Sequence, residues 1–312
     1  MMKKAMVLGA SGGMGQAIVR ELVNREIEVV AFARNEAKLQ TIFGHDDRVI
    51  LWPGDAQNKD ELQKGLYDID VIFHALNVPY SQWEQKLEKI MINVVELAKE
   101  KNIKLAIVDN IYAYGEGNGK KISEDYPKQP HTKKGKVRLR LEEIVKNSGV
   151  SALFAHFPDF YGPGAEQSML HYFFASVRQD KTAMFIGNQK VKREYIYTPD
   201  GAKAIITLAH HPDAYGQHWN IPATDVISGK EIIELVREVE RFTKKVFTVK
   251  KGLISFLGLF DKDMKEVVEM LYLTEDPVVL SGEKYEKHIL TLPRTPYREG
   301  IKQTLSYYKG EE

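Results

Sequence analysis

Short apolar runs alternate with amphipathic stretches through the first half of the chain. The apolar runs predict β-strands, which we place at Ala5–Leu8, Glu28–Ala33, Val49–Trp52, Val71–Ala75, Leu105–Val108 and Ala152–Ala155. Between them, apolar residues recur every three or four positions, as on one face of a helix, most clearly over Gln82–Lys101 and Val137–Lys146. Strands that are apolar throughout are typical of a parallel sheet covered by helices on both faces. The pattern therefore predicts an α/β fold, a doubly wound parallel sheet of the Rossmann type.

The pattern changes after Phe157, where the regular alternation ends and aromatic residues become frequent. We expect residues 1–157 to form an NAD(P)-binding Rossmann domain and residues 158–312 to form mainly a small C-terminal substrate domain. Arg193–Tyr197 and His218–Ile221 are the later segments expected to return to the main sheet. An amphipathic pattern over Met264–Tyr272 predicts a helix that lines an apolar pocket or a dimer face.

A glycine-rich loop joins the first predicted strand to the first predicted helix. Its sequence is Gly9-Ala-Ser-Gly12-Gly-Met-Gly15. In that position one glycine permits the tight turn, one lets the backbone approach a pyrophosphate, and one allows close packing of helix on strand. The N-terminus of the helix adds unpaired N–H groups and a positive dipole end. The predicted cofactor contacts are Gly9, Ser11, Gly12, Gly13, Met14 and Gly15.

The residues after the second strand bear on the adenosine ribose. A site for NAD usually places Asp or Glu there to accept from the ribose 2′-hydroxyl, whereas Arg accommodates the 2′-phosphate of NADP. This chain has Phe32-Ala33-Arg34-Asn35, without a carboxylate at that point. A guanidinium pairs with phosphate through two parallel hydrogen bonds. The sequence favours NADP over NAD, with a solvated surface role for Arg34 as the alternative.

Small and polar residues follow the third and fourth strands. The Asp55 carboxylate either accepts a hydrogen bond from the adenine amino group or caps the helix expected near Lys59. His74, at the end of the fourth strand, is expected to pack rather than to bind a ligand. The cofactor contacts predicted here are Asp55, Ala56, Ala75, Leu76 and Asn77.

Composition narrows the functional classes. The 312 residues carry 44 basic and 43 acidic side chains, so the formal net charge is +1 and no global field attracts nucleic acid or an anionic membrane. Cysteine is absent, which excludes disulfides and thiolate chemistry. No His, Asp or Glu spacing matches a metal-binding motif, and the apolar run Ala5–Leu8 is too short for a signal-peptide core. We therefore expect a cytoplasmic protein with a small-molecule substrate, without nucleic acid, membrane or metal.

Several motifs together resemble the short-chain dehydrogenase/reductase superfamily, in its extended or atypical branch with the nucleoside-diphosphate-sugar epimerases and dehydratases. In chain order they are Gly9-x-x-Gly12-x-x-Gly15, Asp55-Ala56, Tyr112-Ala-Tyr114-Gly115, Phe160-Tyr161-Gly162-Pro163-Gly164 and Arg193-Glu-Tyr-Ile-Tyr-Thr-Pro-Asp200. The resemblance implies NADP-dependent or NAD-dependent oxidation, reduction or epimerisation of a small carbonyl or sugar-like substrate. It also implies a homodimer, which related folds commonly form by packing two long helices from each subunit.

The resemblance fails at the residues that carry the family's chemistry. The family's Ser or Thr, four residues before the Tyr of its Val-Tyr-Gly motif, is replaced by Asn110, and its Tyr-x-x-x-Lys pair reads Lys134 and Arg138. The latter two lie on one helix face, where adjacent cations disfavour each other's charge and only Lys loses a proton readily.

Two interpretations of this substituted set stay open. In the first, Lys134 is a general acid/base, Asn110 donates a hydrogen bond to a carbonyl oxygen and Arg138 holds ribose hydroxyls. Tyr112 or Tyr114 is then an alternative proton donor, and Tyr114 matches the family's motif Tyr. In the second, Lys134 and Arg138 form a solvated or phosphate-binding face of a non-catalytic NADP-binding sensor or regulator.

Overall fold

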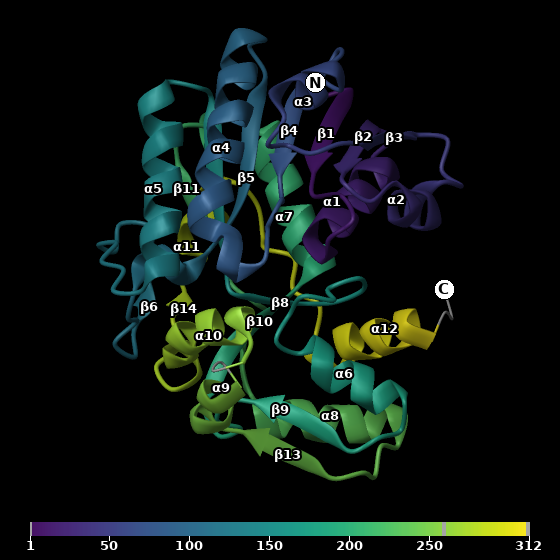
Figure 1. The fold of residues 1–312 in the computed structure, drawn as a ribbon, viewed down its shortest axis with the longest axis vertical. Coiled ribbons are helices and arrows are strands. Elements are labelled where there is room, and N and C mark those ends of the chain that lie inside the picture. The colour runs from purple at the N-terminus through teal and green to yellow at the C-terminus, as the bar shows by residue number, and fades with distance from the viewer. Residues whose placement is uncertain (1, 258–259, 310–312) are drawn as a thin grey trace.

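The structure, a computed structural model, describes residues 2–257 and 260–309 (Figure 1). Its largest element is an all-parallel sheet of seven strands in the order β11-β7-β5-β4-β1-β2-β3. These strands are β1 (Lys4–Leu8), β2 (Glu28–Ala33), β3 (Val49–Pro53), β4 (Val71–His74), β5 (Lys104–Asn110), β7 (Ala152–Phe157) and β11 (His218–Asn220). The chain winds from β1 out to β3 and then crosses back to β4, so a switch point lies between β1 and β4. The predicted Rossmann-type sheet is confirmed.

Helices cover both faces of this sheet. They are α1 (Gly13–Asn24), α2 (Glu36–Phe43), α3 (Lys59–Lys64), α4 (Trp83–Glu100), α5 (Lys133–Ser148) and α7 (Thr198–His210). Successive residues of β1 enter different cores: Ala5 and Val7 join the core that includes α1 and α7, and Met6 and Leu8 join the core that includes α4 and α5. No helix within the described ranges is long and apolar enough to cross a membrane.

Much of the later chain lies beyond the carboxyl ends of the main strands, in the lower half of Figure 1. Three small sheets lie outside the main one. The first contains β8 (Asp159–Tyr161), β10 (Lys192–Tyr197) and β12 (Val226–Ser228), and the second pairs β9 (Ala183–Ile186) with β13 (Val246–Val249). The third pairs β14 (Val279–Leu280) with β6 (Lys121–Ile122) from the first half of the chain. The later helices are α6 (His171–Arg178), α8 (Gly229–Glu240), α9 (Lys251–Leu257), α10 (Lys262–Val268), α11 (Glu283–His288) and α12 (Tyr297–Lys309). Apart from α11, which packs beside β11, these elements face the edge at which doubly wound proteins bind ligands.

Two expectations about the second half are resolved by the sheet pairing. β11 does return to the main sheet, where it pairs in parallel with β7. The prediction that Arg193–Tyr197 returns there is wrong, because β10 pairs with β8 and β12 instead. An apolar run shows that a segment is extended, but its pairing partner depends on contacts distant in sequence.

The helix predicted over Met264–Tyr272 is only partly correct. The segment begins within α10 and continues as a 3-10 helix, η4 (Glu269–Thr274). Glu266 of α10 and Glu269 of η4 both lie beside Lys134 in the first turn of α5.

Candidate functional site

The glycine-rich loop leaves the N-terminus of α1 open. Gly12 is the N-cap residue, with no side-chain cap and no acidic residue in the first turn. Gly9 has φ of 80°, and a Cβ there would lie 2.7 Å from Cα of Leu76. A Cβ on Gly15 would overlap the carbonyl oxygen of Gly9. The backbone of the loop thus runs against the chain that leaves β4, and the space before α1 suits a phosphate group.

The other predicted residues of this loop contribute mainly backbone. The Ser11 carbonyl accepts from Nε2 of Gln16 at 3.1 Å. A Cβ on Gly13 would lie 2.6 Å from Cα of Ala165, in the segment after β8. The Met14 side chain is buried and lies against Gly201 of α7, so it supports the loop from the core.

The end of β2 presents an exposed arginine. Arg34 is exposed, and its side chain makes no hydrogen bond or ion pair with the described residues. The next residue, Asn35, caps α2 by accepting from the Lys38 N–H at 2.9 Å. The guanidinium is therefore available to a ligand at the edge of the sheet.

The structure decides between the alternatives for Asp55. Its carboxylate accepts from the Gln57 N–H at 3.0 Å, whereas the side chain that caps α3 belongs to Asn58. The capping alternative is wrong, and Asp55 instead shapes the turn after β3. Ala56 beside it is buried, and its carbonyl accepts from Asn93 at 3.0 Å.

Arg138 lies beside the end of β4. Its side chain is buried, its guanidinium carbon is 4.4 Å from the Trp83 ring centroid, and a guanidinium nitrogen is 3.6 Å from the Asp109 carboxylate. A second guanidinium nitrogen lies 3.5 Å from Oδ1 of Asn77. The structure therefore brings a predicted catalytic residue to a predicted cofactor residue. Arg138 Nε has no partner among the described atoms, so the group retains a donor.

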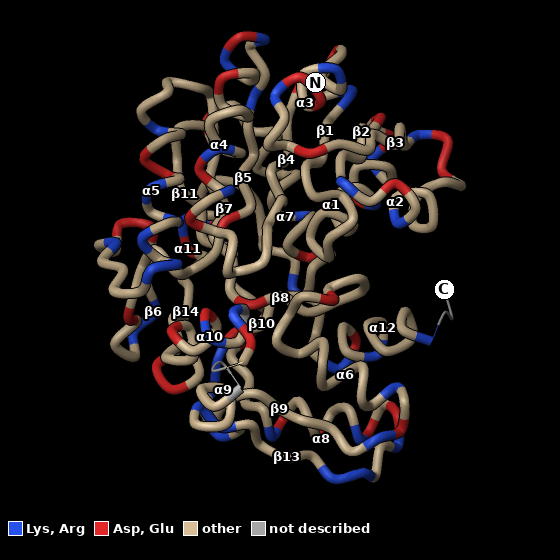
Figure 2. Tube along the Cα trace, viewed as in Figure 1, with Lys and Arg blue, Asp and Glu red and all other residues tan. Residues whose placement is uncertain are grey.

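Lys134 is buried one helical turn earlier. Helix α5 begins there because Thr132 accepts from the Gly135 N–H at 3.0 Å. The Lys134 ammonium contacts the Glu266 carboxylate and lies 3.4 Å from that of Glu269. Two side chains from a segment more than a hundred residues away therefore hold its charge. Figure 2 shows acidic and basic segments adjoining around α10 and β10.

Two tyrosines form a hydroxyl pair, and the ring of one of them, Tyr80, lies near Lys134. The hydroxyls of Tyr80, in η1 (Tyr80–Gln82), and Tyr112, in η2 (Ile111–Tyr114), are 2.6 Å apart. The Lys134 ammonium is 5.8 Å from the Tyr80 ring centroid. Burial raises the pKa of Tyr80 to about 12 and also raises the pKa of Tyr112. No motif marks Tyr80 in the sequence, because the fold alone pairs it with Tyr112.

Asn110 and Tyr114 are placed differently from Tyr112. Oδ1 of the Asn110 side chain caps η2 by accepting from the Tyr112 N–H at 3.0 Å. The Tyr114 hydroxyl donates to Oδ1 of Asn220 at 2.8 Å, and burial raises its pKa. Tyr114 thus directs its hydroxyl to β11, and the structure does not bring it to Lys134.

A further ion pair that the sequence motifs did not identify lies at the ends of β8 and β10. The Arg193 guanidinium contacts the Asp159 carboxylate, and both residues belong to paired strands. The guanidinium also lies 5.1 Å from the ring centroid of Tyr195. The Asp159 charge contributes to the raised pKa of Tyr80, so this pair adjoins the hydroxyl pair.

Comparison with known proteins identifies the family. Residues 5–222 match the model of the NAD dependent epimerase/dehydratase family. The chain belongs to this family. The resemblance drawn from the motifs is confirmed, and the family is nicotinamide-dinucleotide dependent.

Relatives and solved structures agree over the full length. A putative UDP-glucose 4-epimerase of Methanocaldococcus jannaschii is 22% identical, over 98% of this chain and 98% of that protein. The dTDP-glucose 4,6-dehydratase of Bacillus anthracis in complex with NAD has a TM-score of 0.82 and 17% identity, over 99% of this chain and 97% of that chain. The UDP-glucuronic acid 4-epimerase of Bacillus cereus, in complex with UDP-glucuronic acid and NAD, has a TM-score of 0.80 and 18% identity, over 99% of this chain and 100% of that chain. At these identities the solved structures establish the fold.

Proposed function

We propose that this protein is an NADP-dependent oxidoreductase or epimerase that acts on a small carbonyl or sugar-like substrate, with a nucleotide sugar as the first class to test. The observation that carries the proposal is the buried placement of Lys134 and Arg138 beside Asn77 and the Tyr80–Tyr112 hydroxyl pair. Ionisable and hydroxyl groups gathered at the carboxyl ends of parallel strands are typical of a catalytic centre.

The residues present fit a dinucleotide. The open N-terminus of α1 and the absence of side chains at Gly9 and Gly12 leave room for the pyrophosphate. Arg34 is proposed to pair with the 2′-phosphate, and Asp55 with Ala56 to lie at the adenine. Ala75, Leu76 and Asn77 would pass under the nicotinamide half, where Arg138 holds ribose hydroxyls. The nicotinamide, when bound, supplies or accepts a hydride.

Proton handling is assigned to this chain's own side chains. Lys134 would donate a proton to a substrate oxygen, or accept one from it, after release from Glu266. Asn110 would donate an amide hydrogen bond to the same oxygen. The Tyr80–Tyr112 pair offers an alternative donor, because the Tyr80 ring lies beside the Lys134 ammonium, whereas the hydroxyl of Tyr114 donates to Asn220.

A specific observation favours a second function, that of a non-catalytic NADP-binding sensor or regulator. The side chains at all three substituted positions already have partners: Lys134 pairs with Glu266, Asn110 caps the Tyr112 N–H and Arg138 pairs with Asp109. Proton exchange between Lys134 and a substrate would therefore require α10 to release the ammonium.

The cofactor assignment is tested with Arg34→Ala. We expect NADP affinity to fall about tenfold or more, because a charge-assisted phosphate contact is lost, while NAD affinity stays within about twofold. Arg237→Ala, an exposed arginine on α8, is the matched control. Fluorescence titration with both dinucleotides measures the effect, and equal losses for NADP and NAD would remove Arg34 from this role.

Turnover is tested separately from binding. Purified protein is incubated with NADP or NAD and a panel of UDP- and dTDP-sugars and small carbonyl compounds, and nicotinamide absorbance and sugar NMR spectra are followed. We expect one substrate class to react, and Lys134→Met to lower kcat at least about a hundredfold. Tight binding without turnover of any compound would favour the sensor.

A further inference from the structure

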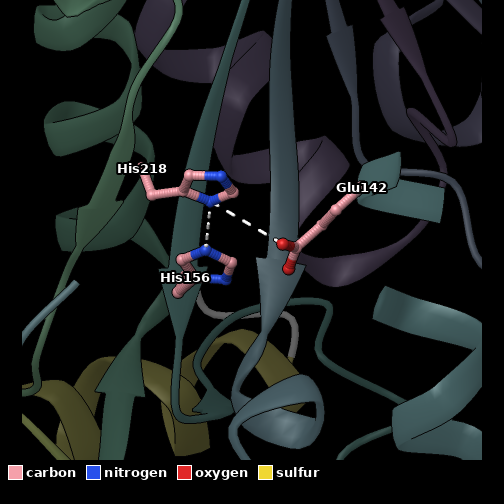
Figure 3. A group of neighbouring side chains, drawn as sticks. All are labelled: Glu142, His156 and His218. Atoms are coloured by element: carbon pink, nitrogen blue, oxygen red, sulfur yellow. Dashed lines mark hydrogen bonds and ion pairs between the residues drawn. The ribbon is translucent and has the colours of Figure 1, made fainter. Parts of the chain in front are cut away.

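A second buried cluster of ionisable groups lies behind the candidate site. Glu142 of α5, His156 of β7 and His218 of β11 point toward one another (Figure 3). Each offers one ligand atom, and these atoms all lie within 4.8 Å of one another. Nε2 of His156 is 2.9 Å from Nδ1 of His218, which is 3.9 Å from the Glu142 carboxylate. Sequence spacing could not reveal this group, because its members come from three elements that only the sheet order brings together.

The histidine rings are held in the form and orientation that a metal ligand needs. Nδ1 of His156 faces the Asn110 carbonyl at 3.4 Å and Asp109 at 3.9 Å, so its proton belongs there and the Nε2 lone pair faces the cluster. Phe154 stacks on His218 with ring centroids 4.7 Å apart and fixes that ring. Burial lowers the pKa of both histidines, which leaves neutral imidazoles.

The space between the ligand atoms already holds a positive charge. The Lys128 ammonium is 2.5 Å from the Glu142 carboxylate, 3.2 Å from Nε2 of His156 and 3.4 Å from Nδ1 of His218. Lys128 lies on the irregular segment between β6 and α5, not on the rigid elements that carry the other three side chains. The ligand atoms therefore surround a cation, and that cation is supplied by a side chain of an irregular segment.

The donor atoms of the cluster suit a divalent transition metal ion. Burial, together with the nearby Asp109 charge, raises the pKa of Glu142. Two neutral imidazoles and one carboxylate are a ligand set for zinc and other divalent first-row transition metals, whereas magnesium and calcium prefer oxygen ligands alone.

We propose that Glu142, His156 and His218 bind one divalent transition metal ion of the zinc type, and that Lys128 is the internal cation which the metal displaces. The proposal does not depend on the proposed dinucleotide function. The metal site nevertheless adjoins the candidate site, because Glu142 shares α5 with Arg138, and Arg138 pairs with Asp109 at 3.6 Å. The displaced Lys128 would release the segment before α5.

The experiment compares metal binding by tag-free wild type, Lys128→Met, His218→Ala and the Lys128→Met/His218→Ala double variant. Zn²⁺ affinity and stoichiometry are measured by calorimetry, and Co²⁺ absorption spectra report nitrogen coordination. We expect wild type to bind one ion per chain. Lys128→Met should bind Zn²⁺ at least about tenfold more tightly than wild type, because the competing ammonium is gone. His218→Ala should weaken binding at least about tenfold in both backgrounds.

Two substitutions at exposed positions are the controls for these variants. Lys121→Met replaces an exposed lysine near the same segment, and His45→Ala replaces an exposed histidine; both should bind as wild type does. Absence of a His218-dependent ion in wild type overturns the metal site, and equal affinity in wild type and Lys128→Met overturns the displacement. If circular dichroism shows that Lys128→Met does not fold, the comparison of wild type with His218→Ala still decides whether the site binds metal.

Discussion

The Gly9–Gly15 loop and the first turns of α5 approach the same end of the main sheet but present different groups. The loop presents backbone, with an open helix N-terminus and almost no side chains. The α5 face presents buried charges, each paired with a side chain from elsewhere in the chain: Lys134 with Glu266 and Arg138 with Asp109. A backbone cradle depends on local geometry alone, whereas a paired charge depends on where a distant segment docks. Substitutions should therefore affect the two parts differently.

The largest effect is expected for Gly15→Ala. Its Cβ would overlap the Gly9 carbonyl, and backbone on both sides leaves no room for relief. We expect dinucleotide affinity to fall at least about a hundredfold and the free energy of unfolding to fall by about 3 kcal/mol. Urea denaturation and fluorescence titration measure the two quantities.

Gly149→Ala is the control for that substitution. Unlike Gly15, Gly149 has a positive φ, 73°, but nothing lies within 4 Å of a Cβ built there. It should lose only about 1 kcal/mol of stability and no dinucleotide affinity. If Gly15→Ala behaves like Gly149→Ala, close backbone approach is not what the loop requires.

On the α5 face, Lys134→Met is expected to cause a smaller loss of stability. The substitution leaves Glu266 and Glu269 facing a buried apolar group, with side chains 27% and 25% exposed, respectively. We expect the free energy of unfolding to fall by about 2 kcal/mol, less than for a fully buried pair because water reaches both carboxylates. Lys133→Met, at the exposed neighbouring position, should change it by less than about 0.5 kcal/mol. Urea denaturation at pH 7.5 distinguishes them, and equal stability of the two variants would show that the pair is dispensable.

The smallest effect concerns His74, which lies between the two parts at the end of β4. Burial, assisted by the Arg138 charge, lowers the pKa of His74 from its ordinary 6.5 to about 4, and neither ring nitrogen has a partner among the described atoms. Because the folded-state pKa lies below the unfolded-state value, the stabilising contribution is present above pH 6.5 and is lost as the pH falls toward 4. Between pH 7.5 and 6.0 the free energy of unfolding of wild type should fall by about 1 kcal/mol more than that of His74→Phe.

Thermal and urea denaturation across this pH range test that difference. His45→Phe, at an exposed histidine, should leave the wild-type acid sensitivity in place. Equal acid sensitivity of wild type and His74→Phe would mean that His74 gains a proton without leaving its buried position.

Much of the fold could be predicted from local patterns. The apolar runs located β1, β2, β3, β4, β5 and β7 because a strand buried on both faces must be apolar at successive positions. The same signal could not assign β10 to its sheet, since pairing partners are not encoded in one segment. It also could not tell that Asn58 rather than Asp55 caps α3, because both are short polar side chains with acceptor oxygens in the turn before the helix.

In the candidate site, too, residues in motifs could be predicted and contacts between distant residues could not. The glycine loop, Arg34, Lys134 and Arg138 were found from sequence, since each occupies a motif position or the end of a predicted strand. Tyr80 and the Asp159–Arg193 pair were missed because their partners are distant in sequence. Tyr114 matched a motif, yet its hydroxyl donates to Asn220 on the returning strand β11.

The sequence by itself determined the doubly wound sheet and the glycine loop, because short-range periodicity and residue identity specify both of them. Only the tertiary structure decided which charges are paired, which hydroxyls meet and that Glu142, His156 and His218 surround Lys128. The physical reason is that side-chain chemistry depends on burial and on neighbours within a few ångströms, and the packing of α10, β7 and β11 supplies those neighbours from distant parts of the chain.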